Sequence, residues 1–129
     1  MNNRAINEIR KKNRLDKEGA LEKVFELMLT GVKVNNPELL HIRGIISCGK
    51  NVKIDLNVII EGKVRLEDNV SIGANSILRD CTIGKGTVIN PFSLIEGSVI
   101  GENCFIGPYG RIRPGVSIED CVQIGNFVE

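Results

Sequence analysis

Aliphatic residues recur every six positions through most of the chain, and this pattern constrains the fold more than any other feature. The row comprises Ile54, Ile60, Leu66, Ile72, Leu78, Ile83, Ile89, Ile95, Ile100, Ile106, Ile112, Ile118 and Ile124. Only the steps from 78 to 83 and from 95 to 100 shorten to five residues. A register that persists this far predicts a solenoid rather than a β-sandwich, whose strands alternate for about four to eight residues and then stop.

A second row of small or β-branched residues precedes the first by two positions. It comprises Val52, Val58, Val64, Val70, Ser76, Cys81, Thr87, Ser93, Ser98, Cys104, Gly110, Val116 and Val122. Because residues two apart on a strand share a face, both rows are expected to point into the core. Three such hexads close one triangular coil, and four to five coils are expected between about Ile42 and Glu129.

Glycines directly after the aliphatic residue are expected to turn the chain from one side of the prism to the next. They are Gly73, Gly84, Gly101, Gly107 and Gly125. Glycine permits either a positive φ or a tight corner.

The first forty residues are charged and have a helical rhythm instead. One apolar face is predicted from four side chains at helical spacing: Leu21, Val24, Phe25 and Met28. Gly31 follows Thr30 where the C′ glycine of a helix would stand, and Pro37 marks a turn before the repeat. Gly19 is expected to weaken or interrupt this helix, since glycine costs about 1 kcal/mol there relative to alanine.

Composition and charge exclude several classes of protein. The chain has 129 residues, a formal net charge of +1 and 4% aromatic residues, which fits one domain without the basic stripe of a nucleic-acid-binding protein. No apolar run approaches the roughly 20 residues of a membrane span, and the N-terminus lacks the apolar core of a signal peptide. A cytoplasmic protein without a membrane span is expected.

The cysteines and the single histidine do not indicate a metal site. The four cysteines form no Cys-x-x-Cys pair, and His41 is the only histidine. In a cytosolic chain the thiols are expected to be reduced. The repeat register places Cys48, Cys81 and Cys104 inside, buried, and Cys121 outside.

Four strings of the sequence and its start resemble a known enzyme family. The strings are His41–Gly44, Asn57–Gly62, Ile106–Gly115 and Ile124–Glu129, and the start carries Asn2-Asn3-Arg4. They resemble the bifunctional N-acetylglucosamine-1-phosphate uridylyltransferase/glucosamine-1-phosphate N-acetyltransferases, over nearly the whole chain.

The resemblance implies a fold and a division of the chain. The expected fold is mainly β, a hexapeptide-repeat left-handed parallel β-helix, trimeric in the family, preceded by an N-terminal α-helical arm. Residues 1–30 would correspond to the end of the uridylyltransferase domain and the linker helix. Residues 31–129 would be part of the N-acetyltransferase domain, with a connector at 31–41 and β-helix coils at 42–129.

The resemblance also implies an activity that this chain alone should lack. The family acetylates glucosamine-1-phosphate with acetyl-CoA and then transfers uridylyl from UTP with Mg²⁺, which yields UDP-N-acetylglucosamine for cell-envelope polymers. The nucleotide-binding domain that precedes Asn2 in the family, and the general-base histidine and acetyl-CoA region that follow Glu129, do not occur here. No catalytic residue is therefore expected within the chain, and neither co-substrate nor metal is expected to bind it well.

Two residues match functional positions of the family. Arg113 corresponds to the arginine of Arg-Pro-Gly that contacts the substrate sugar phosphate; without the resemblance it would be a solvated arginine on a turn. Asn2 corresponds to the asparagine that holds magnesium and the nucleotide sugar, a role expected only in the full-length parent, because its partner residues are missing.

Three other functional interpretations are weaker. The run Gly44–Lys50 fits most of a phosphate-binding loop, but Asn51 replaces the Ser or Thr and a strand is expected to follow. His41 has no acidic or cysteine cluster beside it and is expected at the surface. The third interpretation is a γ-class carbonic anhydrase, which has the same fold. That class needs several metal-binding histidines, and the single histidine of this sequence excludes it. The alternative that stays open is a non-catalytic β-helical trimerisation module.

Overall fold

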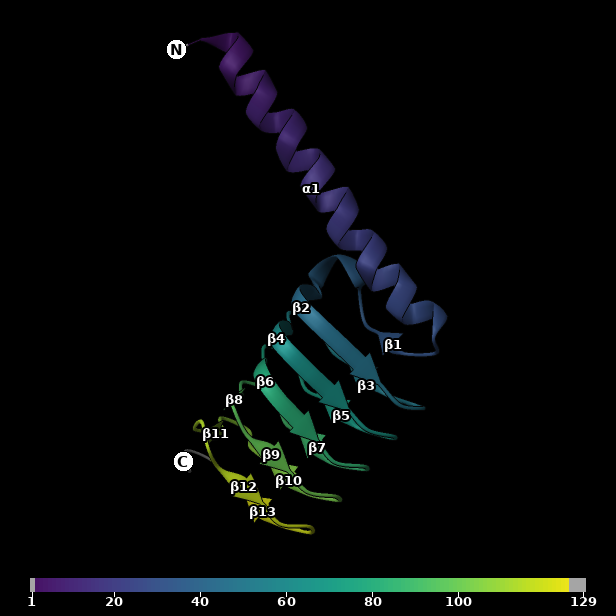
Figure 1. The fold of residues 1–129 in the computed structure, drawn as a ribbon, viewed down its shortest axis with the longest axis vertical. Coiled ribbons are helices and arrows are strands. Elements are labelled where there is room, and N and C mark those ends of the chain that lie inside the picture. Colours follow the sequence, from purple (N-terminus) through teal and green to yellow (C-terminus); the bar gives the residue numbers. More distant parts are fainter. Residues whose placement is uncertain (1, 126–129) are drawn as a thin grey trace.

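The computed structural model describes residues 2–125 as one long helix followed by a parallel β-helix of about five coils (Figure 1). The helix α1 spans Asn3–Leu29, and the 3-10 helix η1 spans Pro37–Leu39. The strands are β1 (Lys33–Val34), β2 (His41–Cys48), β3 (Lys53–Ile54), β4 (Ile59–Leu66), β5 (Ser71–Ile72), β6 (Ile77–Ile83), β7 (Val88–Ile89), β8 (Leu94–Glu96), β9 (Val99–Ile100), β10 (Phe105–Ile106), β11 (Arg111–Ile112), β12 (Ser117–Ile118) and β13 (Gln123–Ile124). The predicted mainly β solenoid with a helical arm is confirmed.

The strands form the three faces of a prism, and all of their pairings are parallel. The first face has the order β1-β3-β5-β7-β10-β13. Strands β2, β4 and β6 are long enough to run over two faces, because β6 pairs first with β8 and then with β9. Strand β11 extends the second face beside β8, and β12 extends the third beside β9.

The hexads account for the length of each coil. Ile60 pairs with Ile42 and with Leu78, so each of these coils contains three full hexads. Leu78 pairs with Ile95 and Ile83 with Ile100, so the two five-residue steps each shorten a coil by one residue. The backbone stays in register because an aliphatic residue always meets an aliphatic residue of the neighbouring coil.

Both inward rows lie in the core as predicted. From Val52 to Ile112 every residue of the two rows is buried, and most of the aliphatic side chains are fully enclosed. In the last described coil Val116, Ile118, Val122 and Ile124 are only partly buried. They pack against the core on one side, and no further coil within residues 2–125 covers the other.

Of the two roles predicted for the turn glycines, a positive φ is the rarer one at the corners. Among the five glycines expected at the turns, only Gly107 has a positive φ. The positive φ falls instead on the residue just before the small inward residue, most often asparagine, as in Asn51, Asn57, Asn69, Asn75 and Asn103. Asparagine tolerates this region better than other L-residues, so a period-six search for glycine misses it.

Glycines that follow an aliphatic residue are required for close approach between coils instead. A Cβ at Gly73 would lie 2.6 Å from the backbone nitrogen of Pro91 in the next coil. A Cβ at Gly84 would collide with the carbonyl oxygen of Gly101. The tight corner, rather than the left-handed backbone, therefore explains these two positions.

Helix α1 is continuous through Gly19, so of the two effects considered for this glycine the interruption does not occur. The side chain of Asn2 caps its start by accepting a hydrogen bond from the Arg4 backbone N–H at 2.8 Å. Thr30 caps the end, and Gly31 follows with φ +106, which confirms the predicted C′ glycine. A glycine that points into solvent weakens a helix without breaking it.

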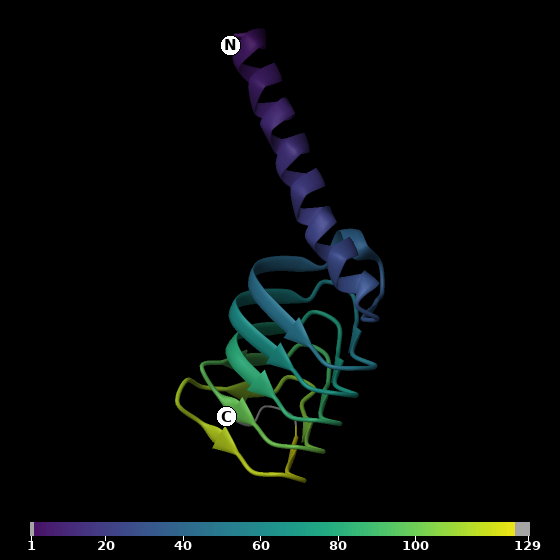
Figure 2. The same cartoon turned by 45° about the vertical axis from the view of Figure 1, so that its right-hand side comes forward.

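Only the C-terminal end of α1 packs against the solenoid, and the rest projects away from it (Figure 2). Val24 and Leu27 are buried in the same core cluster as Val32 and Leu40. Phe25, predicted on the buried face, is 47% exposed, and Leu27 takes its place. Although α1 is long, no helix within residues 2–125 is apolar enough over its length to cross a bilayer.

The segment between helix and solenoid already contributes to the first face. Strand β1 pairs with β3, so Val34 lies beside Ile54. Asn36 has φ 54 and caps η1 by accepting from the Glu38 backbone N–H at 3.2 Å. The predicted turn around Pro37 is confirmed, and the connector region 31–41 thus includes a strand of the β-helix.

Candidate functional site

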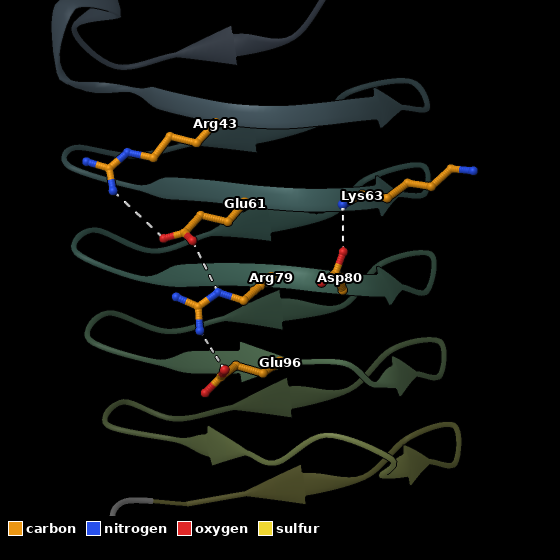
Figure 3. A network of polar contacts seen from close by, with 6 residues as sticks. All are labelled: Arg43, Glu61, Lys63, Arg79, Asp80 and Glu96. Atoms are coloured by element: carbon orange, nitrogen blue, oxygen red, sulfur yellow. Dashed lines mark hydrogen bonds and ion pairs between the residues drawn. The ribbon is translucent and has the colours of Figure 1, made fainter.

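Four charged side chains lie one above the other on the second face of the prism, and we call them the charge ladder: Arg43, Glu61, Arg79 and Glu96. The register places each beside the next, since Arg43 pairs with Glu61, Glu61 with Arg79, and Arg79 with Glu96. The side chains point toward one another across the coils (Figure 3).

The contacts of the charge ladder are shortest around Arg79. Its Nε lies 3.2 Å from Oε2 of Glu61, and its Nη1 lies 2.7 Å from Oε2 of Glu96. Arg43 and Glu61 are farther apart, at 3.9 Å. The hydrogen bond and charge of Glu61, followed by the hydrogen bond of Glu96, raise the pKa of the Arg79 guanidinium.

The two carboxylates of the charge ladder are the more enclosed partners. The side chain of Glu96 is 19% exposed and that of Glu61 is 27% exposed, against 41% for Arg79. Enclosed carboxylates that accept charge-assisted hydrogen bonds hold a defined orientation, unlike a typical surface ion pair.

Arg113 follows this row in the sequence. It is the residue directly after β11, where Arg111 pairs with Leu94 and Ile112 with Ile95. The paired register ends at Ile112, one residue before Arg113, and the ion pairs of the charge ladder end at Glu96. In the sequence, arginine and glutamate alternate at the spacing of one coil from Arg43 to Arg113. Arg113 is exposed, at the corner between the second and third faces.

The turn after Arg113 is fixed by the coil before it. The Gly115 backbone N–H donates to the Gly97 carbonyl at 2.8 Å, and both glycines have a positive φ. A Cβ at Gly97 would lie 3.0 Å from Cβ of Pro114, so glycine leaves room for the proline. The Arg-Pro-Gly string thus holds Arg113 at a rigid corner.

The turn before β11 is equally constrained. Tyr109 stacks on Phe92, with ring centroids 5.2 Å apart and planes 9° from parallel. The Gly110 backbone N–H donates to the buried Ser93 hydroxyl at 3.3 Å. Strand β11 is therefore anchored at both ends, and Arg113 is presented on a preorganised backbone.

The other candidate residues lie elsewhere. Asn2 is at the start of α1, which Figure 1 shows at the opposite end of the molecule from β11. His41 begins β2 and is exposed, as predicted, on the first coil. Arg113, Asn2 and His41 are thus not brought together. The run Gly44–Lys50 lies mostly in β2, hydrogen-bonded beside β4, and β3 rather than a helix follows, so it forms no phosphate-binding loop.

The cysteines are free thiols and follow the register with one difference. Cys81 and Cys104 are buried and Cys121 is exposed, as predicted. Cys48 is only partly buried, because it stands in the first coil and meets Leu66 on one side alone. Burial raises the pKa of Cys48 to about 11. Burial and the charge of Asp80 raise that of Cys81 to about 12. Within residues 2–125, no three potential metal ligands gather.

Sequence reasoning identified Arg113 and missed the charge ladder that leads to it. The signal was available, because arginine and glutamate alternate at positions 43, 61, 79, 96 and 113 with the spacing of one coil. The apolar hexads do not reveal this alternation, because the charged side chains face outward. The predicted string Ile124–Glu129 lies mostly outside the described residues.

Comparisons with known proteins match most of the chain. The model of the GMPPB C-terminal domain family matches residues 42–128. The bifunctional protein GlmU of Nitrosospira multiformis is 50% identical over 115 residues, which is 84% of this chain and 25% of that protein. GlmU of Paraburkholderia phytofirmans is 48% identical over 103 residues, 80% of this chain and 23% of that protein.

A third relative, GlmU of Pseudoalteromonas atlantica, is 43% identical over 108 residues, 84% of this chain and 24% of that protein. The chain therefore spans about a quarter of the length of these relatives. Identity of this level over most of the chain, together with the match to the family model, places the chain within one family. The chain belongs to the GMPPB C-terminal domain family, and over most of its length it is 43–50% identical to these three bifunctional GlmU proteins.

Proposed function

We propose that this chain forms the first coils of an acetyl-transfer domain, in an enzyme that makes UDP-N-acetylglucosamine, and that Arg113 binds the phosphate of glucosamine-1-phosphate. The observation that carries this proposal is the placement of Arg113, exposed at a corner that Pro114 and Gly115 hold rigid. The bifunctional GlmU relatives supply the reaction.

The chemistry of arginine suits the proposed ligand. A guanidinium offers five N–H donors in a fixed fork and stays charged at any working pH, so it can hold two phosphate oxygens at once. The rigid backbone around β11 reduces the ordering that binding would otherwise require. A substrate held in this way is oriented for attack on a second substrate, which supplies much of the catalysis in group transfer.

Proton transfer is the step for which this chain is proposed to lack a suitable group. The amine of glucosamine-1-phosphate must lose a proton as it attacks the thioester of acetyl-CoA, and a positioned general base contributes roughly 10²–10⁴ in rate. The single histidine, His41, lies in β2, and strands β4, β6 and β8 separate it from β11 along the second face. The 129-residue chain alone is therefore proposed to be inactive.

The uridylyl transfer of the proposed parent enzyme requires Mg²⁺, and this chain does not fit the ion by itself. The Asn2 carboxamide oxygen already accepts from the Arg4 backbone N–H, and among residues 2–125 no three histidine, cysteine or acidic side chains gather to hold a metal ion. Asn2 is proposed as a magnesium ligand only when the nucleotide-binding domain of such a parent is present. In this chain it caps α1.

Release of coenzyme A, followed with a thiol reagent, tests the proposal. The chain should show no turnover with acetyl-CoA and glucosamine-1-phosphate, whereas a version extended by the downstream coils of a GlmU relative should turn over. Robust release by the 129-residue chain would refute its inactivity. No release by a folded extended chain would refute the acetyl-transfer assignment.

A second candidate is a trimerisation module that performs no chemistry. One observation favours it: Ile59, Ile77 and Leu94 form a partly exposed aliphatic row on the second face, in register across three coils. Such a row suits burial against a second copy. Light scattering at tens of micromolar should give three times the mass of one chain under either proposal. Acetyl transfer by the extended trimer then separates the two.

A further inference from the structure

We propose that Arg111 is a second binding residue for the phosphate of the sugar substrate, so that β11 and the residue after it present two guanidinium groups to one anion. This inference rests on the proposed function of Arg113 and adds a second group to that site. The proposed reaction does not otherwise employ Arg111.

Arg111 and Arg113 lie on the same side of the chain at β11. Ile112, which separates them, is 2% exposed, whereas both arginines are exposed. Successive side chains of extended backbone alternate between two faces, so the arginines flank Ile112 and point out of the prism. At about 3.3 Å per residue their Cα atoms lie roughly 7 Å apart, and two long side chains can converge on one phosphate from that separation.

The surroundings of Arg111 leave its guanidinium accessible. Arg111 pairs with Leu94, and Leu94 with Ile77, so its aliphatic stem stands at the end of a partly exposed apolar row. An arginine stem can lie along such a row while its charged end stays in water. Within residues 2–125 the Arg111 side chain makes no hydrogen bond or ion pair. Its donors are therefore available to a ligand.

The charge of the second face changes at β11. Up to β8 the arginines of the charge ladder lie beside glutamates, with Arg79 between Glu61 and Glu96. Residues 110–115 contain two arginines and no acidic residue. Two like charges on one side of a strand repel each other, and an anion bound between them removes this repulsion. A phosphate monoester suits the pair, because its charge of about −1.5 to −2 and its three oxygens match two guanidinium forks.

Solvent and pre-organisation have opposite effects on this site. Both arginines are exposed, so water and salt weaken each single contact. The backbone that carries them is fixed, however, since the Gly110 N–H donates to the buried Ser93 hydroxyl at 3.3 Å. A phosphate already held by one arginine meets the second without a further loss of translational freedom. The pair is therefore expected to bind more tightly than either arginine alone.

Arginine side-chain NMR of the 129-residue chain, titrated with inorganic phosphate, tests the pair without the reaction. The Nε–H signals of Arg111 and Arg113 should shift together and reach saturation at the same phosphate concentration. In Arg111→Gln the Arg113 signal should need about three- to tenfold more phosphate, because one of two charge-assisted contacts is lost.

The matched control is Arg43→Gln, which removes the same charge from the other end of the second face and should leave both titrations unchanged. The inference is overturned if phosphate does not shift the Arg111 signal, or if Arg113 titrates alike in Arg111→Gln and in the wild type.

Kinetics of the extended chain provide the second readout. Arg111→Gln should raise the KM for glucosamine-1-phosphate about three- to tenfold and leave the KM for acetyl-CoA unchanged, a split that a general loss of structure would not produce. Arg111→Lys keeps the charge without the fork and should recover part of the loss. A wild-type KM for the sugar phosphate in Arg111→Gln overturns the inference. A rise in the KM for acetyl-CoA instead also overturns it, and would assign Arg111 to the phosphates of coenzyme A.

Failure of the proposed function would look different. If Arg113→Ala leaves the KM for glucosamine-1-phosphate unchanged, Arg113 does not bind the substrate, whatever Arg111 does. If Arg113→Ala raises this KM and Arg111→Gln does not, the proposed function stands and only the second binding residue is wrong.

Discussion

The carboxylate of Asp80 accepts a hydrogen bond from the backbone N–H of Lys63, with Oδ1 2.9 Å from the nitrogen (Figure 3). At this point Gly62 and Lys63 of β4 oppose the single residue Asp80 of β6, so the register shifts by one. Asp68 and Asp120 accept in the same way from the N–H groups of Lys50 and Glu102, at 2.7 Å each. Aspartates thus join neighbouring coils at their corners.

Replacement of Asp80 should destabilise the solenoid according to the side chain that replaces it. Asp80 has φ +49, so Asp80→Ala loses the acceptor and places alanine in the left-handed region, which together should cost about 1–3 kcal/mol. Asp80→Asn keeps an oxygen acceptor and a residue that tolerates this φ, and should cost under about 1 kcal/mol. Urea denaturation measures both. Equal losses for the two variants would contradict the role given to this hydrogen bond.

Gly84 and Gly19 should respond in opposite ways to alanine. A Cβ at Gly84 would collide with the Gly101 carbonyl of the next coil, so Gly84→Ala should lower the free energy of unfolding by about 1–3 kcal/mol. Gly19 has no atom within 4 Å of such a Cβ, and alanine favours a helix by about 0.5–1 kcal/mol. Gly19→Ala should therefore increase helicity in circular dichroism without loss of thermal stability. A tolerated Gly84→Ala would show that the coils are less closely packed.

Cys81 should make the fold less stable at alkaline pH. Its pKa is raised from the ordinary 9.0 to about 12, so the unfolded chain releases this proton at a lower pH than the folded chain. The unfolded state therefore binds fewer protons above pH 9, and the free energy of unfolding falls as pH rises from about 9 toward 12.

The control for this pH dependence is the exposed thiol of Cys121. Chemical denaturation between pH 8 and 11 should show a shallower decline for Cys81→Ala than for the wild type, and the wild-type decline for Cys121→Ala. If Cys81→Ala and the wild type decline in parallel, the buried thiol does not control alkaline stability.

The coils of this fold could be predicted from the sequence because one repeated physical requirement determines them. Each hexad places an aliphatic residue such as Ile89 and a small residue such as Thr87 inside a narrow core, and both are buried as expected. The two five-residue steps also lie where the sequence predicts them. Leu78 still pairs with Ile95, so the shorter coil keeps every residue on its predicted face.

The details that could not be predicted depend on contacts between coils. Period-six reasoning expected glycines at the turns, with a positive φ or a tight corner, and did not identify Asn69 and Asn103 as residues with a positive φ. The helical spacing predicted that Phe25 lies on the buried face of α1, but in the docked helix Leu27 is buried instead. The repeat register predicted that Cys48 is buried, although Cys48 belongs to the first coil and is covered on one side only. Each error concerns what lies next to a residue in space, which the hexad pattern does not encode.

The candidate site was predictable in part for the same reason. The family string drew attention to Arg113, but the charge ladder on the same face joins residues such as Arg79 and Glu96, which are 17 positions apart and become adjacent only through the coil register. Side chains that face outward leave no apolar pattern. The charge alternation along the second face is the only sequence signal that they produce.

Binding of the sugar phosphate by Arg113 is tested most directly by kcat/KM of the extended chain for glucosamine-1-phosphate. Arg113→Ala should lower this value about tenfold or more, since a charge-assisted hydrogen bond to a ligand contributes roughly 1.5–3 kcal/mol. Arg43→Ala, at the far end of the same row, should leave it unchanged. A value for Arg113→Ala equal to that of the wild type would contradict the claim.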